Sequence, residues 1–171
     1  MTSEINKQEI KKKFCTLGAY AVGKTSLMAR FVKSIFSEKY LTTIGVKIDK
    51  KVVEIDGNPI TLALWDLAGE DEYLQARTSY LRGAAGYLLV VDRTRPDTLT
   101  KAIELKERVD VELGEIPFVL VFNKSDLLDD LQITAAQIEQ LRQDGWDVLE
   151  TSAKTGQGVE DAFMRLTRKV L

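Results

Sequence analysis

The chain has 171 residues, of which 44% are hydrophobic and 29% are charged, and its formal net charge is −2. This length suits one domain with a sizeable core, and the near-neutral charge gives no general electrostatic reason to bind nucleic acid or an anionic membrane. The absence of histidine excludes His-based metal sites, catalytic triads and general bases, and a single cysteine excludes an intramolecular disulfide.

Targeting and anchoring signals are the next feature to consider. No apolar stretch approaches the roughly 20 residues of a membrane span, and the N-terminus lacks a signal-peptide core. Nor is there a C-terminal cysteine box for a prenyl anchor. We therefore expect a cytoplasmic protein with no intrinsic membrane anchor. Residues 1–12 are polar and charged, and we expect them to form a flexible N-terminal arm before a single domain at 13–171.

A phosphate-binding pattern lies between a predicted strand and a predicted helix. The apolar run at 14–17 leads into GAYAVGKT at 18–25, which has the spacing G-x-x-x-x-G-K-[ST]. Glycines let the backbone wrap around a phosphate, and the following helix adds the positive end of its dipole. The pattern predicts that Lys24 reaches the β- and γ-phosphates and that Thr25 ligates Mg²⁺. The predicted nucleotide-binding residues of this loop are Gly18, Ala19, Tyr20, Ala21, Val22, Gly23, Lys24, Thr25 and Ser26. A glycine-containing turn before an ordinary helix is the alternative.

Apolar patterns divide the rest of the chain into strands and helices. Up to residue 82 we predict a helix from Lys24, a loop at 34–45, a hairpin of strands 46–55 and 60–66 around a turn at 56–59, and a polar helical stretch at 70–82. Beyond residue 82 we predict a buried strand at 86–92, a helix from Pro96 and a second buried strand at 117–123. A helix follows that is opened by a Thr134–Gln137 capping box and ended by Gly145. The last predicted elements are a strand at 146–152 and a closing helix.

Three helices have a predicted inner face. These faces are Leu27, Met28, Phe31 and Val32 in the first helix, Leu99, Ala102, Ile103 and Leu113 in the second, and Val159, Ala162, Phe163, Leu166 and Val170 in the last. Strands that alternate with helices imply an α/β fold with a mainly parallel sheet covered on both sides.

Two further segments carry residues suited to Mg²⁺ and a γ-phosphate. Asp66 ends an apolar strand, where a carboxylate can hold Mg²⁺ through water, and the nearby Gly69 N–H can bind a γ-phosphate. Thr43 lies in the predicted loop, where its hydroxyl can close onto Mg²⁺ when a γ-phosphate is present. A simple turn after a strand, and an ordinary loop threonine, are the alternatives at these positions.

Polar residues after two later strands match a guanine base. Asp126 can accept from the ring N–H and the exocyclic amine together, and adenine offers no such pair of donors. The stem of Lys124 can pack over the base, and Asn123 can tie the base loop to the phosphate loop. In the segment Ser152, Ala153 and Lys154, the Ala153 N–H can donate to the guanine carbonyl. Phe36 either covers the base from the side or is a core aromatic. The polar residues at 123–126 and 152–154 follow strand ends, where ligands bind in open α/β sheets; an ordinary turn at a strand end is the alternative for 123–126.

These motifs give the chain a clear family likeness. It resembles the Ras superfamily of small GTPases over residues 13–171, and it is most similar to the Rab branch. The likeness rests on TIGVK (43–47), WDLAGEDEY (65–73), YLRGAAGYLLVVD (80–92), NKSD (123–126) and ETSAKTGQGVEDAF (150–163). The resemblance implies a P-loop NTPase fold with a six-stranded, mostly parallel sheet, one antiparallel strand and five helices.

The resemblance also implies a function. It implies that GTP and GDP are bound with Mg²⁺, that GTP is hydrolysed, and that switch loops at about 37–46 and 67–78 change conformation and bind effector, exchange-factor and activating proteins. Thr43 and Gly69 correspond to the γ-phosphate sensors, and Tyr40 corresponds to the tyrosine that folds over the phosphates. The metal ligands implied are Thr25, Thr43 and Asp66, and the catalytic candidates are Lys24, Thr43, Gly69 and Glu70.

Three departures from the family pattern bear on activity. Tyr20 stands where the family has a small residue, and Glu70 stands where it has the glutamine that positions the attacking water. The chain also stops after the last helix without terminal cysteines, in which it resembles the prokaryotic Ras-like proteins. We predict a guanine-nucleotide switch with slow hydrolysis. The alternatives are a constitutively GTP-bound interaction module and an ATP-dependent P-loop kinase or ATPase, the last of which NKSD argues against.

Overall fold

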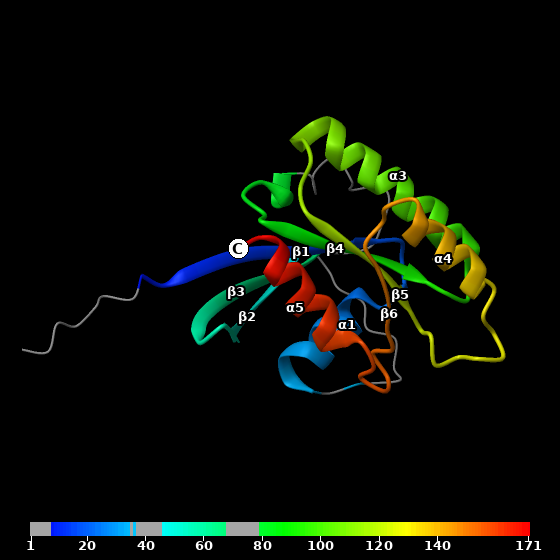
Figure 1. Ribbon diagram of the computed structural model, residues 1–171, viewed down its shortest axis with the longest axis horizontal. Helices are drawn as coiled ribbons and strands as arrows, with labels where there is room; N and C mark the ends of the chain where they lie inside the picture. The colour runs from blue at the N-terminus through cyan, green and yellow to red at the C-terminus, as the bar shows by residue number, and fades with distance from the viewer. Residues whose placement is uncertain (1–7, 35, 37–45, 68–78) are drawn as a thin grey trace, which may run out of the picture.

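A six-stranded sheet forms the centre of the computed structural model, which describes residues 8–34, 36, 46–67 and 79–171 (Figure 1). The strands are β1 (Ile10–Gly18), β2 (Val46–Ile55), β3 (Asn58–Leu67), β4 (Gly86–Asp92), β5 (Phe118–Asn123) and β6 (Val148–Glu150). Their order is β2-β3-β1-β4-β5-β6, and β2 pairs antiparallel with β3 whereas all other pairs are parallel. The predicted mostly parallel sheet with one antiparallel strand is confirmed.

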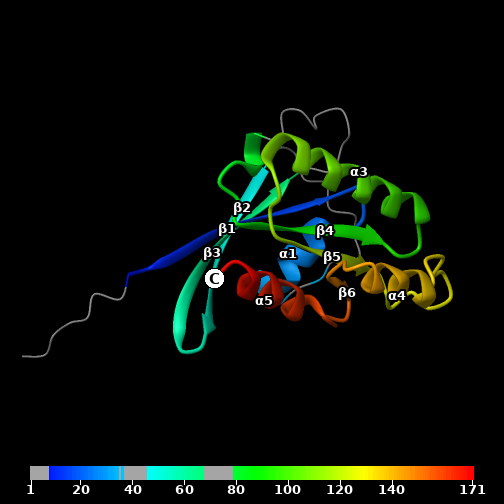
Figure 2. The same ribbon diagram turned by 45° about the horizontal axis from the view of Figure 1, so that its top comes forward.

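Helices cover both faces of the sheet (Figure 2). They are α1 (Lys24–Lys33), α3 (Pro96–Leu113), α4 (Ala135–Gln143) and α5 (Val159–Lys169). Side chains of α1 and α5 enter one core cluster, in which the rings of Phe31 and Phe163 stack with centroids 4.1 Å apart. Side chains of α3 and α4 enter the cluster on the opposite face. The predicted helical stretch 70–82 lies mostly outside the described residues, and its last part is helical at 79–81.

Strand β1 begins earlier than predicted. Residues from Ile10 onward pair in parallel with β3, from Ile10 beside Ile60 to Thr16 beside Asp66. The expected arm at 1–12 is therefore wrong in its last three residues, and residues 1–7 lie outside the described ones. The lysines here suit a strand because a long side chain can lie along the sheet with its charge at the surface. Lys13, for example, places its Nζ 3.7 Å from the ring centroid of Trp65.

The inner face of α3 also differs from the prediction. Its buried residues are Thr98, Ala102, Leu105 and Val109. Of the four predicted inner residues only Ala102 is buried, while Leu99 and Leu113 are partly buried at the edge of the core. Thr98 takes the first inner position, where its hydroxyl accepts from the Asp92 N–H at 3.0 Å and donates to the Arg95 carbonyl at 2.7 Å. A polar residue thus belongs to the buried face of this helix.

The hairpin turn and the last strand are shorter than predicted. Asn58 and Pro59 belong to β3, so only Asp56 and Gly57 connect it to β2. Of the predicted strand at 146–152, only β6 itself pairs with β5. Residues 151–153 continue past the end of the sheet as a buried loop, which is the segment predicted to contact the base.

Candidate functional site

The phosphate loop, residues 18–22, leaves the carboxyl end of β1, and side chains engage each of its carbonyl groups. The bonds run from Lys24 to Gly18 and Ala19 (2.9 Å each), from Arg95 to Tyr20 (2.7 Å), from Lys124 to Ala21 (2.9 Å) and from Asn123 to Val22 (3.0 Å). In a trans peptide the N–H points opposite to the C=O, so the N–H groups of Ala21, Val22 and Gly23 face away from the side chains of Arg95, Lys124 and Asn123. Successive N–H groups arranged in this way form an anion-binding concavity.

At two positions of the motif, neighbouring atoms lie so close to the backbone that only glycine fits. A Cβ atom on Gly18 would lie 2.5 Å from the Val90 carbonyl oxygen, and one on Gly23 would lie 2.2 Å from Asn123 Nδ2. Gly23 also has φ of +102° at the N-cap of α1, a conformation that residues with a Cβ rarely adopt. The motif spacing therefore reflects contacts between the phosphate loop and the ends of β4 and β5, in addition to the turn before α1.

Thr25 and Asp66, two of the predicted Mg²⁺ ligands, lie together. The Thr25 hydroxyl, in the first turn of α1, donates to Asp66 Oδ2 at the end of β3 at 2.7 Å. A hydroxyl beside a carboxylate is a hard-oxygen donor set, which fits Mg²⁺. Within the described residues no group of three or more acidic, cysteine or histidine side chains is arranged so that it could hold a metal ion. Thr43, the third predicted ligand, lies outside the described residues.

Removing the Thr25 hydroxyl tests this assignment. We expect Thr25→Val to weaken GDP binding at millimolar Mg²⁺ by about tenfold, the effect of losing about 1.4 kcal/mol. The measurement is GDP release with and without EDTA. EDTA should accelerate release from the unchanged protein and have little further effect on the variant. Thr61→Val, at the other end of β3 from Asp66, is the matched control and should respond to EDTA as the unchanged protein does. A Thr25→Val protein as sensitive to EDTA as the control would contradict the assignment.

The predicted base loop at 123–126 is tied to the phosphate loop by Asn123. This buried side chain donates to the Val22 carbonyl at 3.0 Å and accepts from the Thr151 hydroxyl at 3.1 Å and the Ala153 N–H at 3.3 Å. Its amide therefore joins three segments that are far apart in the sequence. The Ala153 N–H, predicted to face the guanine carbonyl, is directed at Asn123 in this structure.

Asp126 lies beside the segment that follows β6. Its Oδ1 accepts from the Ser152 hydroxyl at 2.8 Å. Since Ser152 is fully buried, this bond restricts the rotation of the carboxylate. An orientation fixed in advance is what a selective contact to a base requires. Lys154, the last residue of the predicted segment, is exposed.

A buried carboxylate that the motifs did not predict lies between the two loops. Asp92 ends β4 with 2% of its side chain exposed, and its Oδ2 pairs with Lys124 Nζ at 2.9 Å and with Arg95 Nε at 3.0 Å. Burial by itself would raise the pKa of Asp92, but hydrogen bonds from Thr94 and Lys124 and the charge of Lys124 lower it below its ordinary value. The signal was present in the sequence, because Asp92 ends an apolar strand as Asp66 does.

Arg30 is a second residue of the site that the sequence did not indicate. It lies on α1, and its guanidinium donates to the carbonyls of Ala153, at 2.8 Å, and Lys154. The helix that begins at the phosphate loop thereby holds the segment predicted to bind the base. No local pattern could have shown this, since the partners are 123 and 124 residues apart.

The other predicted residues lie as follows. The side chain of Tyr20 is 47% exposed at the surface. Phe36 is partly buried and packs against the core cluster of α1 and α5, in keeping with the core-aromatic alternative, and its contact with a base stays a prediction. Ser26 is partly buried in the first turn of α1. Tyr40, Thr43, Gly69 and Glu70 lie outside the described residues.

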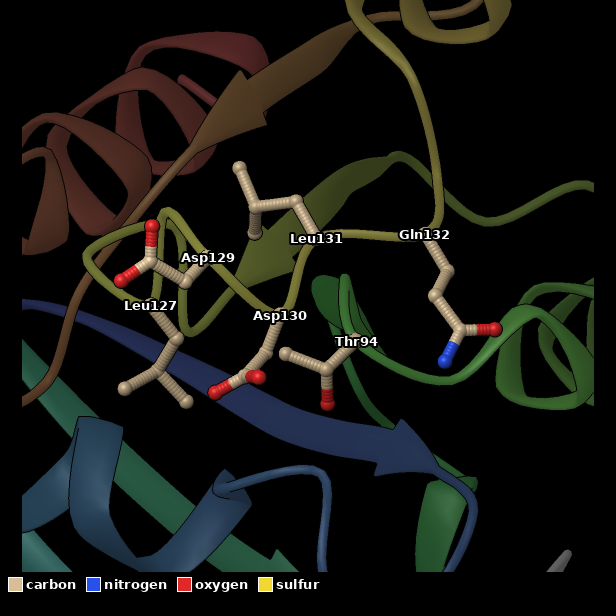
Figure 3. A pocket seen from close by; sticks show the side chains of 6 residues that line it. All are labelled: Thr94, Leu127, Asp129, Asp130, Leu131 and Gln132. Carbon is tan, nitrogen blue, oxygen red and sulfur yellow. The ribbon is translucent and has the colours of Figure 1, made fainter.

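A pocket of 410 Å³ lies beside the base loop (Figure 3). Thr94, after β4, lines one side, and residues of the segment 127–132 line the rest. Because Asp129 and Asp130 are among them, phosphate groups would be repelled from this pocket. This pocket is therefore unsuited to the phosphates of a nucleotide.

Comparison with known proteins identifies the family. A model of the Ras family matches residues 13–171. The chain belongs to the Ras family. Three relatives, each aligned over 161 residues that make up 93% of this chain, are Ras-related protein Rab-4 of Dictyostelium discoideum (34% identical, 78% of the relative covered), Rab-4A of Rattus norvegicus (35%, 74%) and Rab-4B of Homo sapiens (35%, 76%).

Family membership decides between the classes of function. The chain is a Rab-like small GTPase with the P-loop NTPase fold, and guanine-nucleotide binding and GTPase activity are general properties of its family. The ATP-dependent kinase or ATPase alternative is thereby rejected. In the described part of the chain, every helix is too short or too polar to cross a lipid bilayer.

Proposed function

We propose that this chain is a molecular switch that binds GTP or GDP with Mg²⁺, hydrolyses GTP slowly and signals through residues 37–46 and 67–78. The observation that carries the proposal is the Asn123 amide, which bonds to Val22 on one side and to Thr151 and Ala153 on the other. One buried side chain thus joins the loop predicted to bind phosphate to the segments predicted to bind the base, which supports the proposal. A nucleotide would bridge these two segments, with its phosphates at the first and its base at the second.

Guanine is the base that the proposed site prefers. The Asp126 carboxylate, held by Ser152 at 2.8 Å, has a second oxygen with which to accept from a ligand. The ring N–H and exocyclic amine of guanine are adjacent donors that a carboxylate can accept together. Adenine would leave the carboxylate without a matching pair of donors, and a charged acceptor that loses its donors on ligand binding is unfavourable.

At the phosphate end, the chain's own residues position and neutralise the transferred group. Lys24, buried and directed along the loop to the carbonyls of Gly18 and Ala19, brings a positive charge to the β- and γ-phosphates. Thr25 and Asp66 would hold Mg²⁺, directly and through water. When bound, this ion supplies charge neutralisation on the phosphate oxygens. Thr43 and Gly69 are proposed to sense the γ-phosphate, so that partner proteins distinguish the GTP form from the GDP form.

We infer slow GTP hydrolysis from Glu70, the residue that follows Gly69 in the sequence. A glutamine can accept from the attacking water and donate to a phosphoryl oxygen at once, whereas an ionised Glu70 can only accept. A carboxylate about 4 Å from a phosphate charge is disfavoured by about 4 kcal/mol at an effective dielectric near 20, before nearby cations compensate. We therefore place the intrinsic rate at or below the order of 10⁻⁴ s⁻¹.

We expect Glu70→Gln to accelerate single-turnover GTP decay by about tenfold, which corresponds to about 1.4 kcal/mol of transition-state stabilisation. The measurement is the decay of bound GTP in the absence of partners, with Glu115→Gln as a control that removes an exposed carboxylate elsewhere. Tyr20→Gly should matter mainly when an activator that inserts an arginine is added, because the tyrosine ring would obstruct the place where that arginine has to enter. If the unchanged protein hydrolysed bound GTP fast and Glu70→Gln slowed this hydrolysis, Glu70 would be a catalytic base instead.

A constitutively GTP-bound interaction module is the second candidate, and Glu70 is the observation that favours it. The deciding experiment measures which nucleotide co-purifies with the protein and how fast bound GTP decays. A switch should carry mainly GDP, whereas a module without hydrolysis should carry GTP that persists for days. Co-purification of neither guanine nucleotide, with no binding when either is added, would overturn both proposals.

A further inference from the structure

The contact between Arg95 and the phosphate loop belongs to none of the motifs. Arg95 is the N-cap residue of α3, and its Nη2 donates to the Tyr20 carbonyl at 2.7 Å across 75 residues of sequence. Its backbone is held in place from two sides. The following Pro96 restricts Arg95 to extended conformations, and its φ of −132° and ψ of 101° agree. The Thr98 hydroxyl donates to its carbonyl at 2.7 Å.

The peptide that Arg95 holds is next to a strained residue. Ala21 has φ of +60°, in the left-handed region that a residue with a Cβ adopts only at a cost of about 1–2 kcal/mol. Rotating the Tyr20–Ala21 peptide by half a turn would change φ of Ala21 by about 180° and relieve this strain. The same rotation would exchange the directions of the Ala21 N–H and the Tyr20 carbonyl. A carbonyl oxygen would then face the side where the N–H now points.

The hydrogen bond from Arg95 to the Tyr20 carbonyl opposes this rotation. Asp92 strengthens that hydrogen bond. Asp92 Oδ2 accepts from Arg95 Nε at 3.0 Å and pairs with Lys124 Nζ at 2.9 Å, while Lys124 itself donates to the Ala21 carbonyl at 2.9 Å. The buried Asp92 carboxylate therefore orients both side chains, Arg95 and Lys124, that donate to these two successive carbonyl groups. A hydrogen bond from a charged donor held in this way is stronger than one between neutral groups.

We propose that Arg95 is a positioning residue that keeps the Tyr20–Ala21 peptide in its phosphate-binding orientation and thereby slows the release of bound nucleotide. The proposal rests on the proposed function, since it requires a nucleotide phosphate on the concave side of the loop. Arg95 acts through the backbone of the loop and touches no reacting atom. Its effect is on retention of GDP and GTP alike.

The test measures release of fluorescently labelled GDP from the full chain after addition of excess unlabelled GDP. Arg95→Gln should release the nucleotide about tenfold faster, the effect of losing one hydrogen bond from a charged donor. Arg108→Gln is the matched control, because Arg108 lies on the same helix and, among the described residues, its partly exposed side chain pairs with Glu112 at 3.3 Å. It should release GDP at the unchanged rate.

A second substitution tests the mechanism itself. Glycine adopts φ of +60° without strain, so Ala21→Gly removes the driving force for the peptide rotation. In this background Arg95→Gln should accelerate release by no more than about twofold, because the two residues act on one peptide and their effects are not additive. A general loss of packing around Arg95 would produce the full acceleration in both backgrounds.

The outcomes separate this proposal from the proposed function. An unchanged protein that binds no guanine nucleotide would reject the proposed function itself. If the unchanged protein binds GDP and Arg95→Gln releases it at the same rate, the role of Arg95 is rejected while the proposed function stands. If Arg95→Gln accelerated GDP release equally in the unchanged background and in the Ala21→Gly background, rotation of the Tyr20–Ala21 peptide would likewise be rejected as the mechanism.

Discussion

Asp126→Asn is expected to reverse the base preference of the site. Asparagine replaces one acceptor oxygen with a donor, which is repelled by the guanine amine and matches the second carbonyl of xanthine instead. GTP affinity should fall by about 10²-fold or more, since the lost contact involves a charged acceptor and leaves donors unmatched. XTP affinity should rise, and ATP should stay a poor ligand. Competition of the three nucleotides for the same labelled GDP measures all these changes together.

The contact between Asp126 and Ser152 makes this expectation specific. Ser152 donates to Oδ1 at 2.8 Å, and an asparagine can retain this bond by presenting its own oxygen to Ser152. The loop should therefore keep its conformation, and only the atom that faces the base should change. Asp129→Asn removes an exposed carboxylate three residues further along the same loop and should leave the preference for GTP intact. An Asp126→Asn protein that still prefers GTP would show that the base is recognised elsewhere.

Gly23→Ala is expected to disconnect the phosphate loop from the base loop. The added Cβ would lie 2.2 Å from Asn123 Nδ2, so the amide that joins the two loops must move. Displacing a packed group costs about 1–3 kcal/mol, and the positive φ of Gly23 adds about 1–2 kcal/mol. Together these costs predict a loss of about 10²–10³-fold in affinity for GDP and GTP. Isothermal titration of the nucleotide-free protein measures it.

A glycine in the hairpin turn separates the two causes. Gly57 has φ of +77°, and a Cβ added there would meet nothing within 4 Å. Gly57→Ala therefore carries the backbone strain without the collision, at the opposite end of β3 from Asp66. It should lower the free energy of unfolding by about 1–2 kcal/mol and leave nucleotide affinity unchanged. If Gly23→Ala bound GDP as tightly as Gly57→Ala does, Asn123 could not be the rigid connection between the loops.

Much of the fold and of the site follows from local patterns in the sequence. The alternation of apolar strands with amphipathic helices predicts the layered sheet, because side-chain periodicity depends only on neighbours along the chain. The phosphate loop and the base loop are likewise short runs in which spacing determines the chemistry. Lys24, Thr25 and Asn123 were found in this way, as was Asp66, which follows an apolar strand.

Contacts between distant segments required the tertiary structure. The Arg95 bond to Tyr20 spans 75 residues and the Arg30 bonds to the loop after β6 span 123 and 124, and such pairs depend on which strands become neighbours in the sheet. The start of β1 was missed because its pairing with β3, not its own polar residues, stabilises it. Thr98, a polar residue, lies on the inner face of α3, where its hydroxyl bonds to the end of β4. The sequence alone determines the residues that would meet a nucleotide, and the sheet order decides which arginines and carboxylates hold those residues in place.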